Sequence, residues 1–427
     1  MSRLSTLVLA AALAAALVSS GLQAQAPQMP QGTPAQQAAA ALPDGGAKQL
    51  VARACTACHG INQITNSAGY TKERWHGLLS TMVKLPDPQA DMVAQYLATH
   101  FPPKPGREPK LVSGPVQISF REWQVPTLGQ RSRDPVQSPD GMIFWAGHWG
   151  NIVGRLNPKT GEMREWTLPQ GARPHSITSD RAGNIWYVGN SNGTVGKLDP
   201  KTGEATVYIL PDPAARDPHT PEFDRNGILW FTVQNSNMVG RLNPATGEIK
   251  LVTIPTPDAD PYGLAIDSKG VPWVALTGTY KIARIDPVTM AVREYPVPDQ
   301  KSRIRRTAIT SDDMVWYVNY SLGRLGRLNP ATGEVKEWQS PSGEDTQPYA
   351  IVAVNDIIWY NESRRRPDTL VRFDPKTERF QSWAFPSGVG TLRNLRATAD
   401  GNLLVHQTSV NRIGLVTISR STTTSSR

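Results

Sequence analysis

The sequence predicts two domains: a small all-α domain near the N-terminus, followed by an all-β, seven-bladed β-propeller. Two patterns lead to this prediction. Apolar residues recur at helical spacing between residues 48 and 101, and from residue 116 a strand-and-turn unit repeats about every 43 residues. The chain of 427 residues is also longer than one ordinary hydrophobic core requires.

The first 26 residues have the features of a cleaved secretory signal peptide. Arg3 forms a basic start, an Ala-rich apolar stretch follows, and small residues near position 26 suit cleavage. No later window is apolar enough for a membrane span, so the mature chain is expected in the periplasm with no transmembrane helix. An uncleaved anchor is the alternative, and it would also place the remaining chain outside the cytoplasm.

The all-α domain is expected at residues 48–101, with a flexible Pro/Gln/Ala-rich leader before it (27–47) and a stiff Pro-rich linker after it (102–115). Three helices are predicted. The first contains RACTACHG (53–60), the second begins at the N-cap Thr71, and the third begins at Asp87 and Pro88. The second helix carries an apolar stripe of Trp75, Leu78, Leu79 and Met82.

Cys55 and Cys58 are the only cysteines of the chain, and His59 follows them directly. C-x-x-C-H is the attachment signature of c-type haem: both thiols form thioethers and the histidine ligates the iron. A structural zinc site would need further ligands, a thioredoxin-like dithiol would follow a strand, and a lone disulfide would leave His59 without a role. The motif therefore predicts one covalent haem c, which agrees with export.

Residues 48–101 also resemble small monohaem c-type cytochrome domains, through CTACHGINQITNSAGYTKERWHGLLSTMVKL and MVAQYLATHF. The resemblance implies that Met82, which stands where such domains carry a methionine, is the sixth ligand of the iron. Packing in the core is the other role open to Met82. Met92, His76, His100 or an open position are the alternatives for the iron.

The repeats decide the fold of the remaining chain. Copies of a GRLNPATGE-like segment begin at Gly154, Gly196, Gly240, Ala283, Gly326 and Val371, at intervals of 42, 44, 43, 43 and 45 residues, and a degenerate seventh begins at Arg412. A Trp-containing apolar strand precedes six of them. Short strands joined by Asn/Asp-Pro and Gly turns over about 43 residues indicate a four-stranded propeller blade.

The sequence also predicts how the propeller closes. A strand such as REWTLP or KEWQSP follows each copy except the last, and the missing strand stands at the front as FREWQVP (120–126). The first strand is therefore expected to complete the last blade, which removes the open sheet edges. The propeller is predicted over residues 116–419, and residues 420–427 are expected to be a disordered tail.

PHSITSDRAGNIWYVG and GRLNPATGE look like the virginiamycin B lyase (streptogramin lyase) family of seven-bladed propellers, over about residues 116–419. This resemblance implies elimination of a cyclic depsipeptide ester by a histidine base, aided by acidic residues and Mg²⁺. Asp217 and His219 match the acid-x-histidine pattern with Asp in place of Glu, and His175 matches the histidine with Arg173 in place of the acid. Val233 replaces a second glutamate, and Glu362 is the one acid after a blade Trp.

Equivalent loops of the blades should converge on one mouth of the central channel. In order, they contribute Arg173/His175, Asp217/His219, Asp260/Tyr262, Arg305/Arg306, Gln347/Tyr349 and Arg393/Arg396. A basic, His/Tyr-lined mouth suits a small anionic or phenolic ligand, although merely solvated loop residues are the alternative. The net charge of +9 agrees with an anionic ligand or acidic partner, and nucleic acid is not expected because no binding motif is present.

These observations predict an exported monohaem c-type cytochrome with a ligand-binding propeller. Its electron transfer would be linked to oxidation of a bound substrate or to a partner redox protein. Two alternatives stay open: a Mg²⁺-dependent C–O lyase acting on cyclic depsipeptides, with Asp217, His219 and His175 as catalytic residues, and a non-catalytic docking platform. Magnesium is expected only under the lyase alternative.

Overall fold

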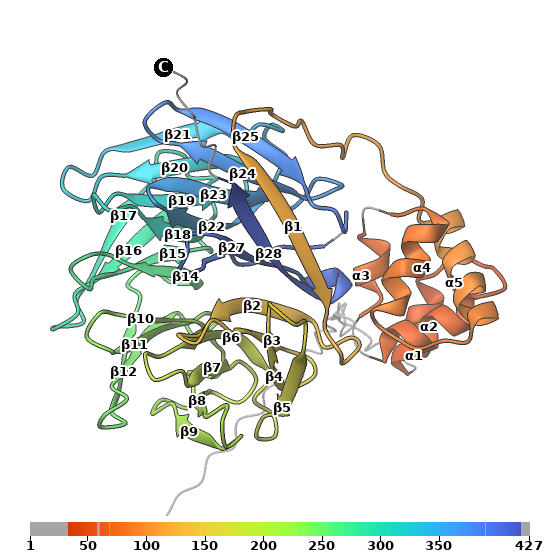
Figure 1. The fold of residues 1–427 in the computed structure, drawn as a ribbon, viewed down its shortest axis with the longest axis horizontal. Helices are drawn as coiled ribbons and strands as arrows, with labels where there is room; N and C mark the ends of the chain where they lie inside the picture. Colours follow the sequence, from red (N-terminus) through yellow and green to blue (C-terminus); the bar gives the residue numbers. More distant parts are fainter. Residues whose placement is uncertain (1–32, 58–59, 68, 389, 420–427) are drawn as a thin grey trace, which may run out of the picture.

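The computed structural model describes residues 33–57, 60–67, 69–388 and 390–419. Figure 1 shows a group of short helices beside a much larger ring of β-sheets. The predicted signal peptide, Cys58, His59 and the C-terminal tail 420–427 lie outside the described residues. Within the described ranges, no helix is long and apolar enough to cross a membrane.

The helical domain contains five helices: α1 (Pro34–Ala40), α2 (Lys48–Thr56), α3 (Asn62–Thr65), α4 (Lys72–Ser80) and α5 (Asp87–His100). The Thr71 hydroxyl accepts a hydrogen bond from the backbone N–H of Arg74, which confirms the predicted N-cap of the second helix. Val51 of α2, Trp75 of α4 and Val93 of α5 meet in one buried core.

The segment expected to be a flexible leader differs in part from the prediction. Residues 34–40 form α1, and Ala38, Ala39 and Leu42 are buried in the core of the helical domain. Thr33 and Gln36 close a capping box at the start of α1. Alanine has the highest helix propensity, so a Gln/Ala-rich sequence that also finds an apolar surface to cover folds as a helix.

The propeller has seven four-stranded antiparallel sheets, as predicted. The inner strands, which surround the channel, are β2 (Ser132–Gln137), β6 (Pro174–Ser179), β10 (Pro218–Phe223), β14 (Pro261–Ile266), β18 (Ile304–Ile309), β22 (Pro348–Val354) and β26 (Arg396–Ala397). The second strands are β3 (Ile143–Gly147), β7 (Ile185–Gly189), β11 (Leu229–Val233), β15 (Pro272–Leu276), β19 (Val315–Asn319), β23 (Ile357–Glu362) and β27 (Leu403–Gln407).

The two outer strands of each blade follow. The third strands are β4 (Ile152–Leu156), β8 (Thr194–Leu198), β12 (Met238–Leu242), β16 (Lys281–Ile285), β20 (Arg324–Leu328), β24 (Thr369–Asp374) and β28 (Arg412–Ser419). The outermost strands are β5 (Met163–Thr167), β9 (Ala205–Ile209), β13 (Ile249–Thr253), β17 (Val292–Pro296), β21 (Val335–Gln339), β25 (Arg379–Ala384) and, in the last blade, β1 (Gln117–Gln124).

The predicted closure is confirmed. β1 pairs antiparallel with β28, from Gln117 opposite Ser419 to Gln124 opposite Arg412. Figure 1 shows these two strands side by side, although they lie at opposite ends of the propeller sequence. The first strand of the propeller sequence is thus the outermost strand of the last blade, and this pairing closes the propeller.

The glycine at the start of the repeat has a local physical reason in the blades that carry it opposite an aromatic residue. Gly154 lies opposite Trp145 across β3 and β4, and a Cβ on Gly154 would stand 2.0 Å from the indole ring. Gly196 is related in the same way to Tyr187. These glycines therefore leave room for the aromatic side chain of the preceding strand, and a Cβ at either position would displace it.

The linker between the domains lies along the sixth blade. The backbone N–H of Arg366 donates to the carbonyl of Arg107 at 2.7 Å, and that of Ser382 donates to the carbonyl of Val112 at 2.9 Å. Figure 1 shows this segment running from the helices along the edge of the propeller to β1. The predicted spacer is thus attached to the sheet by its own backbone groups.

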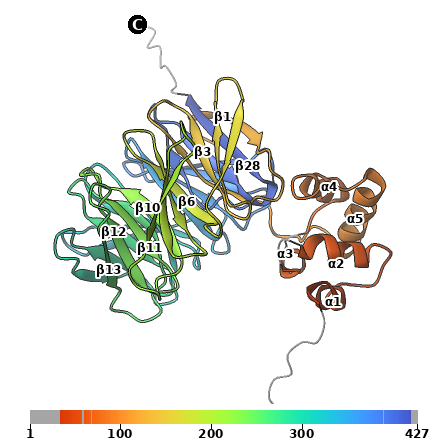
Figure 2. The same ribbon diagram turned by 90° about the horizontal axis from the view of Figure 1, so that it is seen from below.

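The helical domain packs against the propeller, as Figure 2 shows from a second direction. Val410, in the 3₁₀ helix η1 (Thr408–Val410) of the last blade, is a member of the buried core of the helical domain. The backbone N–H of Gly129, before the first blade, donates to the carbonyl of Thr81 after α4 at 3.0 Å. The two domains therefore share a core and a backbone contact.

Candidate functional site

A cavity that is open to solvent lies between the helical domain and the propeller. The helical wall includes Cys55, Ile64, Tyr70, Trp75 and Met82. The wall on the propeller side includes Gly129, Arg131, Trp149, Arg393 and Ser409. One wall is mainly apolar and the other carries two arginines, so the cavity suits an apolar group with acidic substituents.

The cavity brings together two of the residues singled out in the sequence. Cys55, the described cysteine of the C-x-x-C-H motif, and Met82, the predicted sixth ligand, both line it. Met92 is 49 % exposed, and neither His76 nor His100 is among the lining residues. Cys58 and His59 lie outside the described residues, so the thioether and iron assignments stay predictions.

Next to this cavity, seven residues form a ring at the start of the channel, and each blade supplies one: Arg133, His175, His219, Tyr262, Arg305, Tyr349 and Arg393. The pairing of the inner strand with its neighbour shifts at this position, for example between Pro174 and Ile177 and between Pro348 and Ile351. A bulge in a strand redirects the local side chain, so the same irregularity in successive blades presents these residues to the channel.

The aromatic members of the ring lie against one another. The ring centroids of His175 and His219 are 3.7 Å apart, and those of His219 and Tyr262 are 4.0 Å apart. The guanidinium carbon of Arg305 lies 4.8 Å from the ring centroids of Tyr262 and Tyr349, and 4.5 Å from that of Tyr320. The cation is therefore surrounded by three aromatic rings, which stabilises a charge removed from water.

The hydroxyls of Tyr262 and Tyr349 form a short hydrogen bond, and Arg393 Nη1 donates to Tyr349 Oη at 3.1 Å. Burial raises the pKa of Tyr349, but Arg393, Arg305 and the hydrogen bond from Tyr262 outweigh it and lower the pKa to about 7. Burial and the neighbouring phenolate raise the pKa of Tyr262 to about 12. The pair thus holds both protons below about pH 7 and one proton above it, when the negative charge lies on Tyr349.

The histidines of the ring are uncharged at neutral pH. Burial, followed by the charge of Arg133, lowers the pKa of His175 well below its ordinary value, and burial with Arg306 does the same for His219. The same causes, burial first, lower the pKa of His148 to about 3. A buried neutral imidazole can accept a proton only at a substantial energetic cost.

Two arginines predicted at the mouth are placed differently by the structure. Arg173 is exposed, has a positive φ of 43° and contributes its backbone N–H to Asn151 instead of reaching the ring. Arg396 lies farther along the channel, where it forms an ion pair with Glu222. Side chains two residues apart on a strand point the same way, but the bulge breaks this alternation.

Arg306 and Arg133 complete the surroundings of the ring. Arg306 Nε donates to the carbonyl of Arg393 at 2.6 Å, and its Nη2 lies 3.6 Å from the buried carboxylate of Asp134. Arg133 was missed by the sequence analysis because its strand lacks the Pro-His or Pro-Tyr pair of the following blades. The strand pairing identifies the equivalent positions of the first two blades. Phe144 lies opposite Arg155 and therefore corresponds to Trp186, which lies opposite Lys197; Trp145 does not correspond to Trp186.

A model of the virginiamycin B lyase family matches residues 115–285 and 259–426. The chain belongs to the virginiamycin B lyase family. Among solved structures, a streptogramin B lyase has a TM-score of 0.64 and 24% identity, covering 71% of this chain and 98% of the lyase. Virginiamycin B lyase from Staphylococcus aureus has a TM-score of 0.64 and 21% identity, covering 70% and 99%. Identities this low show a shared fold alone.

One further solved structure has a similar fold. Hydrazine synthase of Kuenenia stuttgartiensis has a TM-score of 0.58 and 14% identity, covering 70% of this chain and 97% of that chain. No curated protein matches the chain. The match to the virginiamycin B lyase family covers the propeller and leaves the helical domain outside it.

The acidic residues considered for a lyase in this family are engaged elsewhere. Asp217 accepts hydrogen bonds from the backbone N–H of Asn235 and from Ser236, and burial raises its pKa. Glu362 is fully buried and accepts from Ser340, Ser342 and Thr369. In the described part of the chain, no three His, Cys, Asp or Glu residues are grouped as metal ligands.

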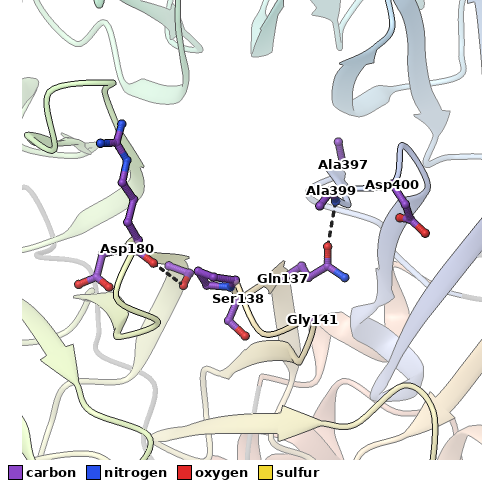
Figure 3. A pocket seen from close by; sticks show the side chains of 10 residues that line it. Gln137, Ser138, Gly141, Asp180, Ala397, Ala399 and Asp400 are labelled. Carbon is purple, nitrogen blue, oxygen red and sulfur yellow. Dashed lines mark hydrogen bonds between the residues drawn. The ribbon is translucent and has the colours of Figure 1, made fainter.

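A second hollow lies at the other end of the inner strands, between blades one, two and seven (Figure 3). Asp180 and Asp400 lie on opposite sides of it. Asp180 already accepts from Asn184 and from Trp186 Nε1, and Asp400 accepts from the Thr398 hydroxyl. These carboxylates stabilise turns, so this hollow offers less chemistry than the ring.

Proposed function

We propose that the protein is an exported c-type cytochrome whose propeller completes the haem cavity and binds a small anionic ligand beside it. The observation that carries this proposal is the position of Arg393, which belongs to the ring and also lines the cavity. One side chain therefore connects a ligand site with a haem site. Electron transfer between the two would need no large movement of the domains.

The residues of the helical domain fit the proposed group. Cys55 and Cys58 would hold a haem c through thioethers, and His59 and Met82 would ligate its iron. Met82 is partly buried in the cavity wall, next to the packed side chains of Trp75 and Leu79. When bound, haem c supplies one-electron transfer at a potential set by its ligands and surroundings.

The residues on the propeller side have a different role. Arg131 stacks on Trp149 with 4.6 Å between its guanidinium carbon and the ring centroid, and Arg393 donates to Tyr349. Both cations would attract the acidic substituents of the haem and would favour the less positively charged, reduced state. Gly129 and Val410 hold this wall against the helices.

The proposal is tested by acid extraction of the purified, exported protein. Covalent haem should stay with the precipitated protein, and the double variant Cys55→Ala, Cys58→Ala should lose it. Ala57→Ser is the matched control, because it changes the same turn and keeps both thiols. Transfer of the colour into the organic phase from the wild type would contradict covalent attachment.

The electron donor is tested with the same protein. Small anionic and phenolic compounds are added to the oxidised form, and reduction is followed by absorbance. Rapid reduction by a small compound alone supports an oxidoreductase. Reduction that occurs only with a partner redox protein supports the docking platform instead.

Lyase activity is the second candidate function, because the chain belongs to the virginiamycin B lyase family and His175 and His219 are neutral at pH 7. A neutral imidazole is the form required of a general base. The surrounding arginines argue against it, because they would repel Mg²⁺ and lower the basicity of both histidines. Metal-dependent ring opening of virginiamycin B would favour this candidate.

A further inference from the structure

Four side-chain nitrogens of the ring arginines are buried and have no hydrogen-bond partner among the described residues. They are Arg133 Nε, Arg133 Nη1, Arg305 Nε and Arg393 Nε. Arg133 is only 3 % exposed, so water does not satisfy its donors readily. A buried charged group that lacks hydrogen bonds is costly, and such groups occur where a ligand supplies the missing acceptors.

The charges around the ring are unbalanced. Asp134 is the buried carboxylate nearest to it, and it is already bound by Arg306 and by Asn394 Nδ2. None of the seven ring residues is a carboxylate. The only anion that the ring itself provides is the phenolate of Tyr349, which Arg393 and Arg305 share.

We propose that the ring is a binding site for a small carboxylate anion, held by Arg133, Arg305 and Arg393, and that Tyr349 takes up one proton when the anion binds. The proton passes from solvent to Tyr349 Oη, and no other bond is formed or broken. This inference names the ligand class of the proposed function and rests on it for the ligand's role. The binding itself does not require haem.

Anion binding is linked to protonation of Tyr349 because the anion and the Tyr349 phenolate compete for the same arginines. Arg393 Nη1 donates to Tyr349 Oη at 3.1 Å, and Arg305 lies over both tyrosine rings of the pair. A bound carboxylate would draw these cations toward itself, and a phenolate beside it would suffer like-charge repulsion. Protonation removes that repulsion and leaves the Tyr262–Tyr349 hydrogen bond in place.

The charged and titratable neighbours of the Tyr262–Tyr349 pair either favour or oppose the ionisation of Tyr349. The cations that favour the phenolate are Arg131, Arg133, Arg305, Arg306 and Arg393. The neutral neighbours are His219, whose ring centroid lies 4.0 Å from that of Tyr262, and His406, which accepts from the backbone N–H of Arg393. The ring of Tyr320 meets the ring of Tyr349 edge-on. Asp134 opposes the phenolate, but Arg306 compensates its charge.

The sign of the pH dependence follows from the pKa of Tyr349, which is about 7. Below this pH, Tyr349 is already neutral and the anion binds without proton uptake. Above it, Tyr349 must take up a proton from solvent when the anion binds, so the affinity falls as the pH rises. Between pH 7 and pH 9 the binding constant should fall roughly 50-fold.

The experiment is calorimetric titration of the full-length protein with benzoate at pH 6, 7, 8 and 9. Each titration is made in two buffers that differ in ionisation enthalpy, which gives the number of protons taken up. Benzyl alcohol is the control ligand, because it has a similar ring and no charge. We expect saturable binding of benzoate alone, with about one proton taken up at pH 9.

Two variants test the residues. Arg133→Gln should weaken benzoate binding at least about tenfold at pH 6, because a charged hydrogen bond is lost. Tyr349→Phe should bind benzoate with little dependence on pH. Tyr320→Phe is the matched control: it removes a hydroxyl from the same group of rings, bound to Gln347 and outside the pair, and should keep the pH dependence.

Each contrary outcome is decisive. Absence of saturable benzoate binding, or equal binding by Arg133→Gln in a variant with a native circular dichroism spectrum, would overturn the anion site. Binding without proton uptake in the wild type would overturn the role of Tyr349. The haem spectrum of the same sample is recorded in parallel, so loss of haem with intact benzoate binding would contradict the proposed function alone.

Discussion

Val410 offers a direct test of how the two domains are held together. It belongs to the last propeller blade, yet it is 4 % exposed and packs among Leu79, Val93 and Leu97 of the helical domain. Val410→Ala removes two buried carbon groups, which costs about 1.5 kcal/mol in transfer free energy. The remaining cavity brings the loss of unfolding free energy to about 2 kcal/mol.

The assay is thermal unfolding followed by two signals, haem absorbance for the helical domain and near-UV circular dichroism for the propeller. A small domain loses several degrees per kcal/mol, so the haem transition should shift down by about 10 °C. Val288→Ala is the matched control, because Val288 is 80 % exposed. Equal transitions in the Val410 and Val288 variants would refute the shared core.

The remaining predictions concern the iron ligand, the buried histidines and the lyase reaction. Met82→Ala should change the haem spectrum and lower the midpoint potential, whereas Met92→Ala should change neither; the reverse result would assign the ligand to Met92. Burial, partly offset by Asp134, lowers the pKa of His406 to about 3, so the folded protein excludes a proton that the unfolded chain binds. Unfolding free energy should therefore fall as the pH drops below 6.5, and His406→Gln should reduce that fall by about 1 kcal/mol between pH 6.5 and 5.5 in urea titrations; an unchanged slope would contradict this. After incubation with virginiamycin B and Mg²⁺, mass spectrometry should find the depsipeptide still cyclic. Linear product that is absent with the His219→Ala variant would contradict this expectation.

Much of the fold was predictable because each blade repeats the same local rules. The Asn/Asp-Pro turns, the repeat period and the displaced first strand are visible in the sequence, and they fix the number of blades and the closure. The docking of the helical domain was not predictable. It depends on Val410, Gly129 and Thr81, which carry no distinctive pattern.

The candidate site was predictable in part for the same reason. His175, His219, Tyr262, Arg305, Tyr349 and Arg393 were found because equivalent loops converge in a propeller. Arg396 and Arg173 were misplaced because strand bulges and a positive φ decide where a side chain points. The hydrogen bond between Tyr262 and Tyr349 could not be predicted from the sequence, because it joins two blades that are not consecutive in the chain.

The central claim is that the propeller completes a haem cavity, and the midpoint potential of Arg393→Gln tests it most directly. The measurement is made at pH 6, where Tyr349 is neutral and does not compensate for the lost charge. Removal of a cation from the cavity wall should lower the potential by an amount on the order of tens of mV. Arg173→Gln, which removes an exposed charge outside the ring, should keep the wild-type potential. Equal potentials for the two variants would contradict the claim.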